Sequence, residues 1–77
     1  MAIKSLSEMQ HAEKGRIVKI RGKADLHRWL FDSGLTIGTI VEMNGADSTR
    51  NPTHIMVKGS ELLLNKEVVA NITVKVK

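Results

Sequence analysis

Apolar and polar residues alternate along several short stretches of the chain, with the two-residue period that a β-strand requires. The first stretch is GRIVKIRG, Gly15 to Gly22, which is bounded by glycines and places Val18 and Ile20 on one face. Further strands are predicted by runs of β-branched and other apolar residues. They are Thr39–Met43, His54–Lys58, Glu61–Leu64 and Ile72–Lys77, with inward positions at Ile55 and Val57 in the second and at Ile72, Val74 and Val76 in the last.

The period changes to that of a helix in the segment KADLHRWLFDSGL. Leu26, Trp29 and Leu30 are spaced i, i+3 and i+4, so a helix would carry all three on its inward face. Asp25 precedes this stripe and is predicted to be the N-cap, because its carboxylate can accept hydrogen bonds from the free N–H groups of a first turn. We therefore expect one short helix over Leu26–Ser33.

Two glycines follow that helix and predict two different backbone turns. Gly34 stands where a residue with positive φ ends a helix, and Leu30 and Leu35 have the spacing of the apolar contact in a Schellman motif. Gly38 stands at the third position of a tight turn, where type II geometry requires a positive φ. We expect the first glycine to end the helix and the second to start the next strand.

Together these patterns predict a mainly β fold, a small and partly open barrel of SH3-like or OB-like type with about five strands and one short helix inserted. The chain has 77 residues, so we expect a single domain that covers residues 1–77. A polar loop is expected at Asn44–Thr53, one helical turn at Asn65–Ala70, and a frayed segment at the N-terminus.

The charge balance is basic, with a net charge of +4 from 12 Lys and Arg against 8 Asp and Glu. Nucleic acid or an anionic protein surface could use this excess. Arg16, Lys19, Arg21 and Lys23 alternate with apolar residues, however, and we interpret them as the solvated face of a strand. The aromatic content of 3% also counts against the stacking platforms that bind single-stranded nucleic acid and against a groove for proline-rich peptides.

No segment of the sequence predicts a signal peptide or a membrane span. The N-terminus is polar, and no apolar run approaches the about 18 residues that a span needs. The sequence also has no cysteine, which excludes disulfides and thiolate metal sites and fits a reducing compartment. We expect a cytoplasmic chain with no direct insertion into the membrane.

Residues with catalytic or metal-binding chemistry are dispersed along the chain. His11, His27 and His54 fall on different predicted elements, and no His-x-Glu or His-Glu-x-x-His spacing occurs. Glu8 and His11 lie three residues apart, and we interpret them as two exposed polar residues. No glycine-rich phosphate loop is present. We therefore expect no catalytic residue, no metal site, no cofactor and no small-molecule substrate.

The order and spacing of the glycines and aliphatic residues resemble the FeoA family, the small ferrous iron transport protein A. The resemblance runs from about Leu6 to Val76, and the helix end and turn from Leu30 to Gly38 are its most specific part. The residues that carry it are Gly15, Ile17, Ile20, Gly22, Leu26, Leu30, Gly34, Leu35, Gly38, Val41, Asn51, Pro52, Val57, Gly59, Leu62, Leu64, Ala70, Ile72 and Val74.

This resemblance implies an SH3-like domain that binds the cytosolic part of FeoB, the GTP-driven ferrous iron permease, and does no chemistry itself. A related domain occurs in metal-dependent repressors, but no helix-turn-helix segment precedes the barrel here, so we expect the accessory protein. A small basic domain that binds nucleic acid or has a regulatory role remains the alternative. The helix distinguishes this barrel from a plain SH3 fold, so we expect the partner to contact its flank and the adjoining turn. These residues are His27, Arg28, Phe31, Leu35, Thr36 and Ile37.

Overall fold

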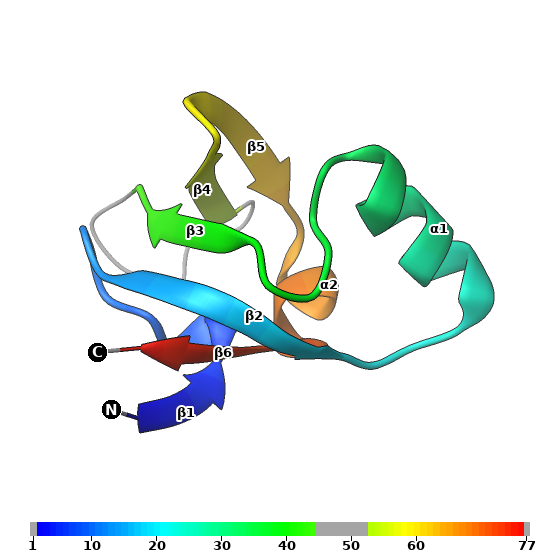
Figure 1. Ribbon diagram of the computed structural model, residues 1–77, viewed down its shortest axis with the longest axis horizontal. Coiled ribbons are helices and arrows are strands. Elements are labelled where there is room, and N and C mark those ends of the chain that lie inside the picture. The colour runs from blue at the N-terminus through cyan, green and yellow to red at the C-terminus, as the bar shows by residue number, and fades with distance from the viewer. Residues whose placement is uncertain (1, 45–52, 77) are drawn as a thin grey trace.

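The computed structural model describes residues 2–44 and 53–76, which form one antiparallel sheet with three short helices. The strand order is β1-β6-β2-β3-β4-β5 (Figure 1). The strands are β1 (Ala2–Ser5), β2 (Lys14–Ile20), β3 (Ile40–Met43), β4 (Thr53–Val57), β5 (Ser60–Leu64) and β6 (Ile72–Val76). The helices are the 3₁₀ helix η1 (Leu6–Glu8) and the α-helices α1 (Ala24–Asp32) and α2 (Lys66–Ala70). The mainly β prediction is confirmed.

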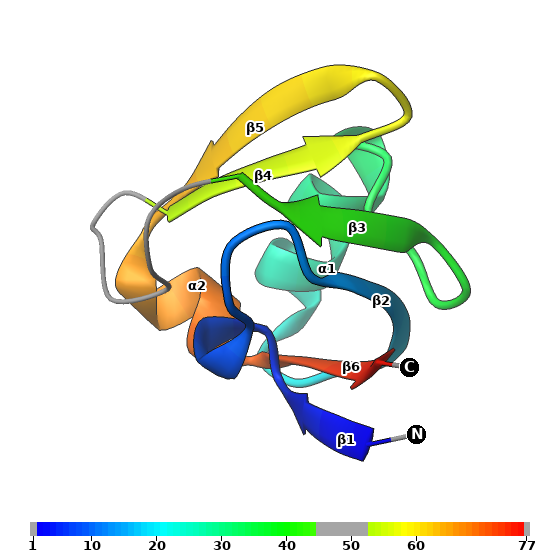
Figure 2. The same ribbon diagram turned by 90° about the vertical axis from the view of Figure 1, so that its left-hand side faces the viewer.

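The sheet curls strongly but does not close into the predicted barrel. Strands β4 and β5 lie across from β6 and β1, with η1 and α2 together at one end (Figure 2). Among the described residues, β1 and β5 are the two edges of the six-stranded sheet and do not pair with each other. The prediction of about five strands in a barrel is corrected to six strands in an open sheet. Strand pairing joins residues that are distant in the chain, and a local pattern does not contain that information.

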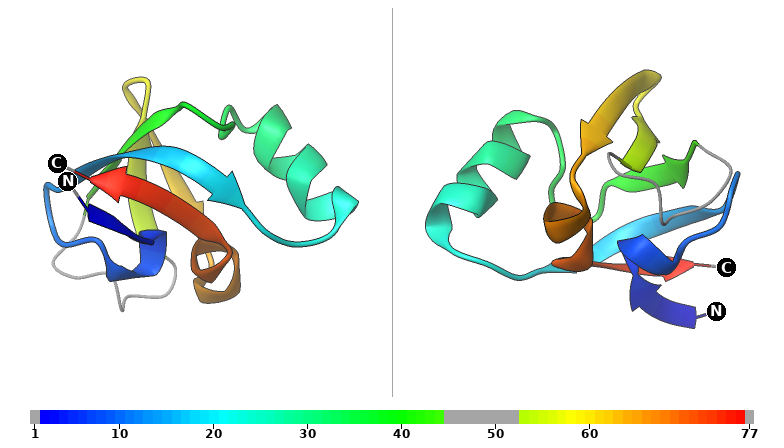
Figure 3. Two further views of the ribbon diagram at one scale, coloured as in Figure 1. Left: turned by 60° about the horizontal axis from the view of Figure 1, so that its bottom comes forward. Right: turned by 180° about the vertical axis from the view of Figure 1, so that it is seen from behind.

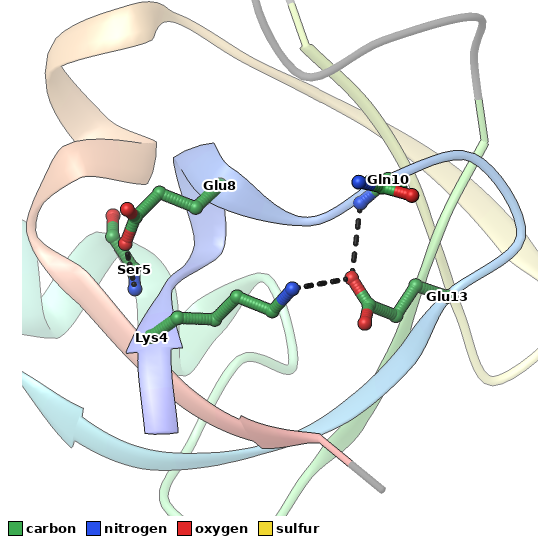
Figure 4. Close-up of polar contacts among 5 residues, drawn as sticks. All are labelled: Lys4, Ser5, Glu8, Gln10 and Glu13. Atoms are coloured by element: carbon green, nitrogen blue, oxygen red, sulfur yellow. Dashed lines mark hydrogen bonds and ion pairs between the residues drawn. The ribbon is translucent and has the colours of Figure 1, made fainter. Parts of the chain in front are cut away.

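The N-terminal segment is ordered, so the prediction of a frayed segment was wrong. The side chain of Ser5 accepts a hydrogen bond from the Ser7 N–H at 3.2 Å. The Ser5 N–H donates to Glu8 Oε1 at 3.0 Å (Figure 4). This reciprocal capping starts η1, which brings Leu6 and Met9 into the core with no exposed surface. Glu8 is therefore a capping residue.

A β-bulge in β2 changes which side chains of that strand are buried. The register against β6 shifts between Ile17 and Lys19. Ile17 is fully buried, whereas Val18 is exposed and Ile20 is half-buried. The pattern placed Val18 and Ile20 on one face, but it did not predict that Ile17 is the buried residue of this strand, because the extra residue of a bulge interrupts the two-residue alternation.

The patterns predicted for β4, β6 and α2 agree with the structure. The predicted inward positions of β4 and β6 are all buried: Ile55, Val57, Ile72, Val74 and Val76. The predicted helical turn is α2, whose N-cap Asn65 accepts a hydrogen bond from the Val68 N–H at 3.0 Å. Ser5 Oγ donates to the Val69 carbonyl of α2 at 3.3 Å and ties this helix to β1. Most of the predicted polar loop, 45–52, lies outside the described residues.

Candidate functional site

Helix α1 projects from the side of the sheet, between β2 and β3 in the chain (Figures 1 and 3). Its N-cap is Lys23, which makes no capping hydrogen bond through its side chain. The predicted N-cap, Asp25, lies instead in the first turn, where a carboxylate still interacts favourably with the positive end of the helix dipole. The N-cap prediction was wrong by two residues.

The buried stripe of α1 is narrower than the sequence pattern predicts. Leu30 is fully buried and Leu26 is half-buried against the core, but Trp29 is 49% exposed. Each helical residue turns by about 100°, so Trp29 lies to one side of the stripe that Leu26 and Leu30 form. The prediction that Trp29 faces inward was wrong, because α1 lies beside the sheet and buries only a narrow face.

The end of α1 has the predicted Schellman geometry. Gly34 has φ +89°, its N–H donates to the Phe31 carbonyl at 3.0 Å, and the Leu35 N–H donates to the Leu30 carbonyl at 2.8 Å. Leu30 and Leu35 both lie in the core, as this motif requires. A rigid turn anchored in the core therefore fixes the direction in which the chain leaves the helix.

The turn that follows is held against β2. The Thr39 N–H donates to the Thr36 carbonyl at 3.0 Å, and Gly38 has φ +94°, as expected for a type II turn. The Gly38 N–H donates to the Ile17 carbonyl at 2.7 Å. At the apex, Ile37 is 61% exposed. A fixed backbone thus presents an aliphatic side chain to solvent.

Of the six predicted contact residues, five reach the surface of the structure. Phe31 is 68% exposed, and His27 lies one turn before it on the same flank of α1. Arg28 and Ile37 are exposed and Thr36 is half-buried. Leu35 is only 1% exposed, so its side chain belongs to the core and we leave it out of the proposed contact surface.

The sequence prediction missed a concave surface beside the turn. One groove of about 700 Å³ is lined in part by Ile37, Ile40 and Lys58, and a second of about 520 Å³ is lined in part by Arg16 and Lys75. The two grooves share Lys14 and Ile40. Alternation in the predicted strand Thr39–Met43 already set Ile40 apart from the buried Val41 and Met43, and this could have indicated an outward-facing side chain.

One ion pair and one contact between a histidine and a carboxylate occur among the described residues. Lys4 Nζ lies 3.0 Å from Glu13 Oε1, which also accepts the Gln10 N–H at 3.0 Å (Figure 4). The Gln10 hydrogen bond, aided by Lys4, holds the pKa of Glu13 below its ordinary value of 4.5. His54 Nδ1 lies 3.1 Å from Glu61 Oε2, which also accepts a hydrogen bond from the side chain of Asn44 at 2.8 Å.

The described part of the chain contains no group of three or more His, Cys, Asp or Glu residues arranged to hold a metal ion. No helix within residues 2–44 and 53–76 is both long and apolar enough to cross a membrane. The site thus consists of surface features alone. They are the exposed flank of α1 at Phe31, the turn apex at Ile37 and the two grooves lined in part by basic side chains.

Comparison with known proteins agrees with the pattern of glycines and aliphatic residues. The model of the FeoA domain family matches residues 4–76. The chain belongs to the FeoA domain family. This confirms the resemblance inferred from the helix end and turn. No curated protein matched the sequence of this FeoA domain.

Solved structures show the same fold. A crystal structure of an iron uptake regulatory protein, FeoA, superposes with a TM-score of 0.90 at 26% identity and covers 99% of this chain and 100% of that one. The iron(II) transport protein A from Clostridium thermocellum has a TM-score of 0.85 at 22% identity, over 95% of this chain and 45% of that one. The IdeR protein of T. acidophilum has a TM-score of 0.87 at 18% identity, over 100% of this FeoA domain but only 35% of IdeR.

Proposed function

We propose that this FeoA-domain chain is a non-enzymatic accessory of ferrous iron uptake. On the cytoplasmic side it binds the cytosolic part of a FeoB-like permease and modulates GTP-driven transport. The family match over residues 4–76 supports this role, as do the similar structures that are named for iron uptake regulation and iron(II) transport. The observation that carries the binding proposal is the projecting helix α1, which holds Phe31 68% exposed.

The flank of α1 is suited to act as a rigid contact surface. Leu30 and the Schellman turn anchor the helix in the core, so little further ordering is needed when a partner binds. Phe31 offers a large apolar side chain that an interface can bury, and aromatic residues are frequent among the residues that dominate binding energy. Arg28 is exposed beside it and can steer the approach of an acidic surface.

The proposal is tested by replacing Phe31 with a polar residue that leaves the helix intact. Phe31→Gln is preferable to an acidic substitution, because a carboxylate near the C-terminus of α1 would oppose the helix dipole. Ile3→Gln is the matched control, since Ile3 is also 68% exposed but lies on edge strand β1. Binding of each purified protein to the cytosolic part of the permease is measured by biolayer interferometry, after circular dichroism has confirmed the fold.

We expect Phe31→Gln to weaken binding by about tenfold or more, whereas Ile3→Gln binds like the unaltered protein. Equal binding by both variants would show that the flank of α1 is not the contact surface. If the unaltered protein does not bind the permease domain at all, the proposed function is wrong.

A further inference from the structure

A row of outward-facing side chains crosses three strands at the centre of the sheet. Arg16 on β2 lies directly opposite Ile40 on β3 and directly opposite Lys75 on β6. Directly opposite residues of an antiparallel pair point to the same face, so the three side chains are neighbours. Two residues further along the same pair of strands, β2 and β3, Lys14 lies opposite Glu42. These strands run side by side in both ribbon views (Figures 1 and 2).

The two grooves on either side of Ile40 form one surface, which we call the basic groove. Its lining includes two exposed aliphatic side chains, Ile37 and Ile40, which are 61% and 50% exposed. It also includes four basic side chains, Lys14, Arg16, Lys58 and Lys75, which we call the rim cations. Protein interfaces combine exposed apolar side chains with polar and charged ones in this way.

Among the described residues, no rim cation forms an ion pair: the Lys4–Glu13 ion pair and the His54–Glu61 contact involve other residues. Glu42 lines the groove and lies directly opposite Lys14, so it offsets part of that charge. Arg16 and Lys75, moreover, are like charges placed directly opposite each other, an arrangement that destabilises a sheet. An anionic partner would relieve this repulsion.

The backbone at Lys58 provides a second indication. Lys58 and Gly59 are the two central residues of the β4–β5 hairpin, with φ values of +51° and +82°. Turns with positive φ at both positions favour Asn, Asp or Gly at the first one. A lysine there is strained, and it is also a rim residue of the groove. Strain of this kind is found most often at functional positions.

We propose that the basic groove binds an acidic segment of the partner protein and that an apolar side chain of this segment packs on Ile37 and Ile40. The proposal rests on the proposed function, and it names the chemistry of the segment that the permease supplies. A nucleic acid fits the groove less well, because the lining contains no aromatic ring on which a base could stack. Since Ile37 belongs to both surfaces, the basic groove continues the contact surface of α1.

Three variants with matched controls test the groove against the cytosolic part of the permease. Ile40→Glu is compared with Leu63→Glu, because Leu63 is a strand residue with a similar exposure of 54%. Lys75→Glu is compared with Lys19→Glu, an exposed strand lysine outside the groove lining. Lys58→Asn removes the charge while suiting the turn better, so its thermal midpoint is expected to equal or exceed that of the unaltered protein.

We expect Ile40→Glu to weaken binding by about tenfold, and Lys75→Glu and Lys58→Asn by about threefold or more, with both controls unchanged. The effect of Lys75→Glu should shrink as salt rises from about 0.05 M to about 0.5 M, because salt screens exposed charges.

If the unaltered protein binds but the groove variants bind as their controls do, the groove assignment is wrong and the proposed function stands. If the unaltered protein does not bind, both are wrong. If a single-stranded RNA oligonucleotide binds the unaltered protein and Lys75→Glu abolishes that binding, the assignment is overturned in favour of nucleic acid.

Discussion

Replacement of Gly34 or Gly38 by alanine measures how much unfolding free energy is lost when a residue with a Cβ atom is held at positive φ. Their φ values are +89° and +94°, and apart from its own residue and the two chain neighbours, a Cβ atom at either position would meet no atom within 4 Å. Clashes with the rest of the protein therefore contribute nothing to the loss of stability. An L-residue in the left-handed region loses about 1–2 kcal/mol, and the stiffer unfolded chain of an alanine variant offsets about 0.4–1 kcal/mol of this. We expect each variant to lose about 1 kcal/mol of unfolding free energy.

The assay is thermal and urea unfolding followed by circular dichroism. For a domain of this size, 1 kcal/mol corresponds to a fall of about 4–8 °C in the thermal midpoint. Asparagine tolerates positive φ better than alanine, so Gly34→Asn should be less destabilising than Gly34→Ala. Unchanged midpoints for Gly34→Ala and Gly38→Ala would refute the assignment of these glycines to the helix end and the turn.

Gly15 provides the contrast, because its substitution is opposed by packing. A Cβ there would lie 3.0 Å from Val76 Cγ1 and 3.1 Å from Val74 Cβ, and its φ is not in the left-handed region. Overpacking of this kind costs about 1–3 kcal/mol. Asparagine is larger than alanine, so Gly15→Asn should lose more unfolding free energy than Gly15→Ala. At Gly34 the alanine variant should be the less stable of the two, whereas at Gly15 the asparagine variant should be.

Two further predictions concern stability. Ala12 has φ +68°, so Ala12→Gly should relieve left-handed strain. We expect the free energy of unfolding to rise by about 0.5 kcal/mol, and a lower urea midpoint would contradict this. The lowered pKa of Glu13 means that its carboxylate stabilises the fold above pH 4.5 and that this contribution is lost as pH falls through the lowered pKa. Glu13→Gln should therefore be less stable than the unaltered protein at pH 7, and the difference in thermal midpoint should vanish in acid. A difference that persists in acid would exclude the ionised Glu13 carboxylate, which accepts from the Gln10 N–H and contacts Lys4, as its cause.

The sequence by itself determined the elements whose causes are local. The Schellman end at Gly34 and the turn at Gly38 follow from the special backbone freedom of glycine, and the N-cap of α2 follows from the side chain of Asn65. The clean alternation of β4 and β6 identified their buried faces. Each of these features depends on residues within one or two turns of the chain, so a pattern read along the sequence contains the necessary information.

The same reasoning placed only some of the predicted contact residues correctly at the surface. Phe31 and Ile37 were expected to be exposed because one lies off the apolar helical stripe and the other follows a helix end, and both are exposed. Leu35 was included with them although the Schellman motif itself requires that side chain in the core.

Only the tertiary structure decided the features that depend on distant pairing. The bulge that buries Ile17 arises from the register of β2 against β6, and the exposure of Trp29 arises from the position of α1 beside the sheet. The basic groove exists because β2, β3 and β6 bring Arg16, Ile40 and Lys75 into one row. Residues so far apart in the chain become neighbours only through strand order and register, which many long-range contacts determine together.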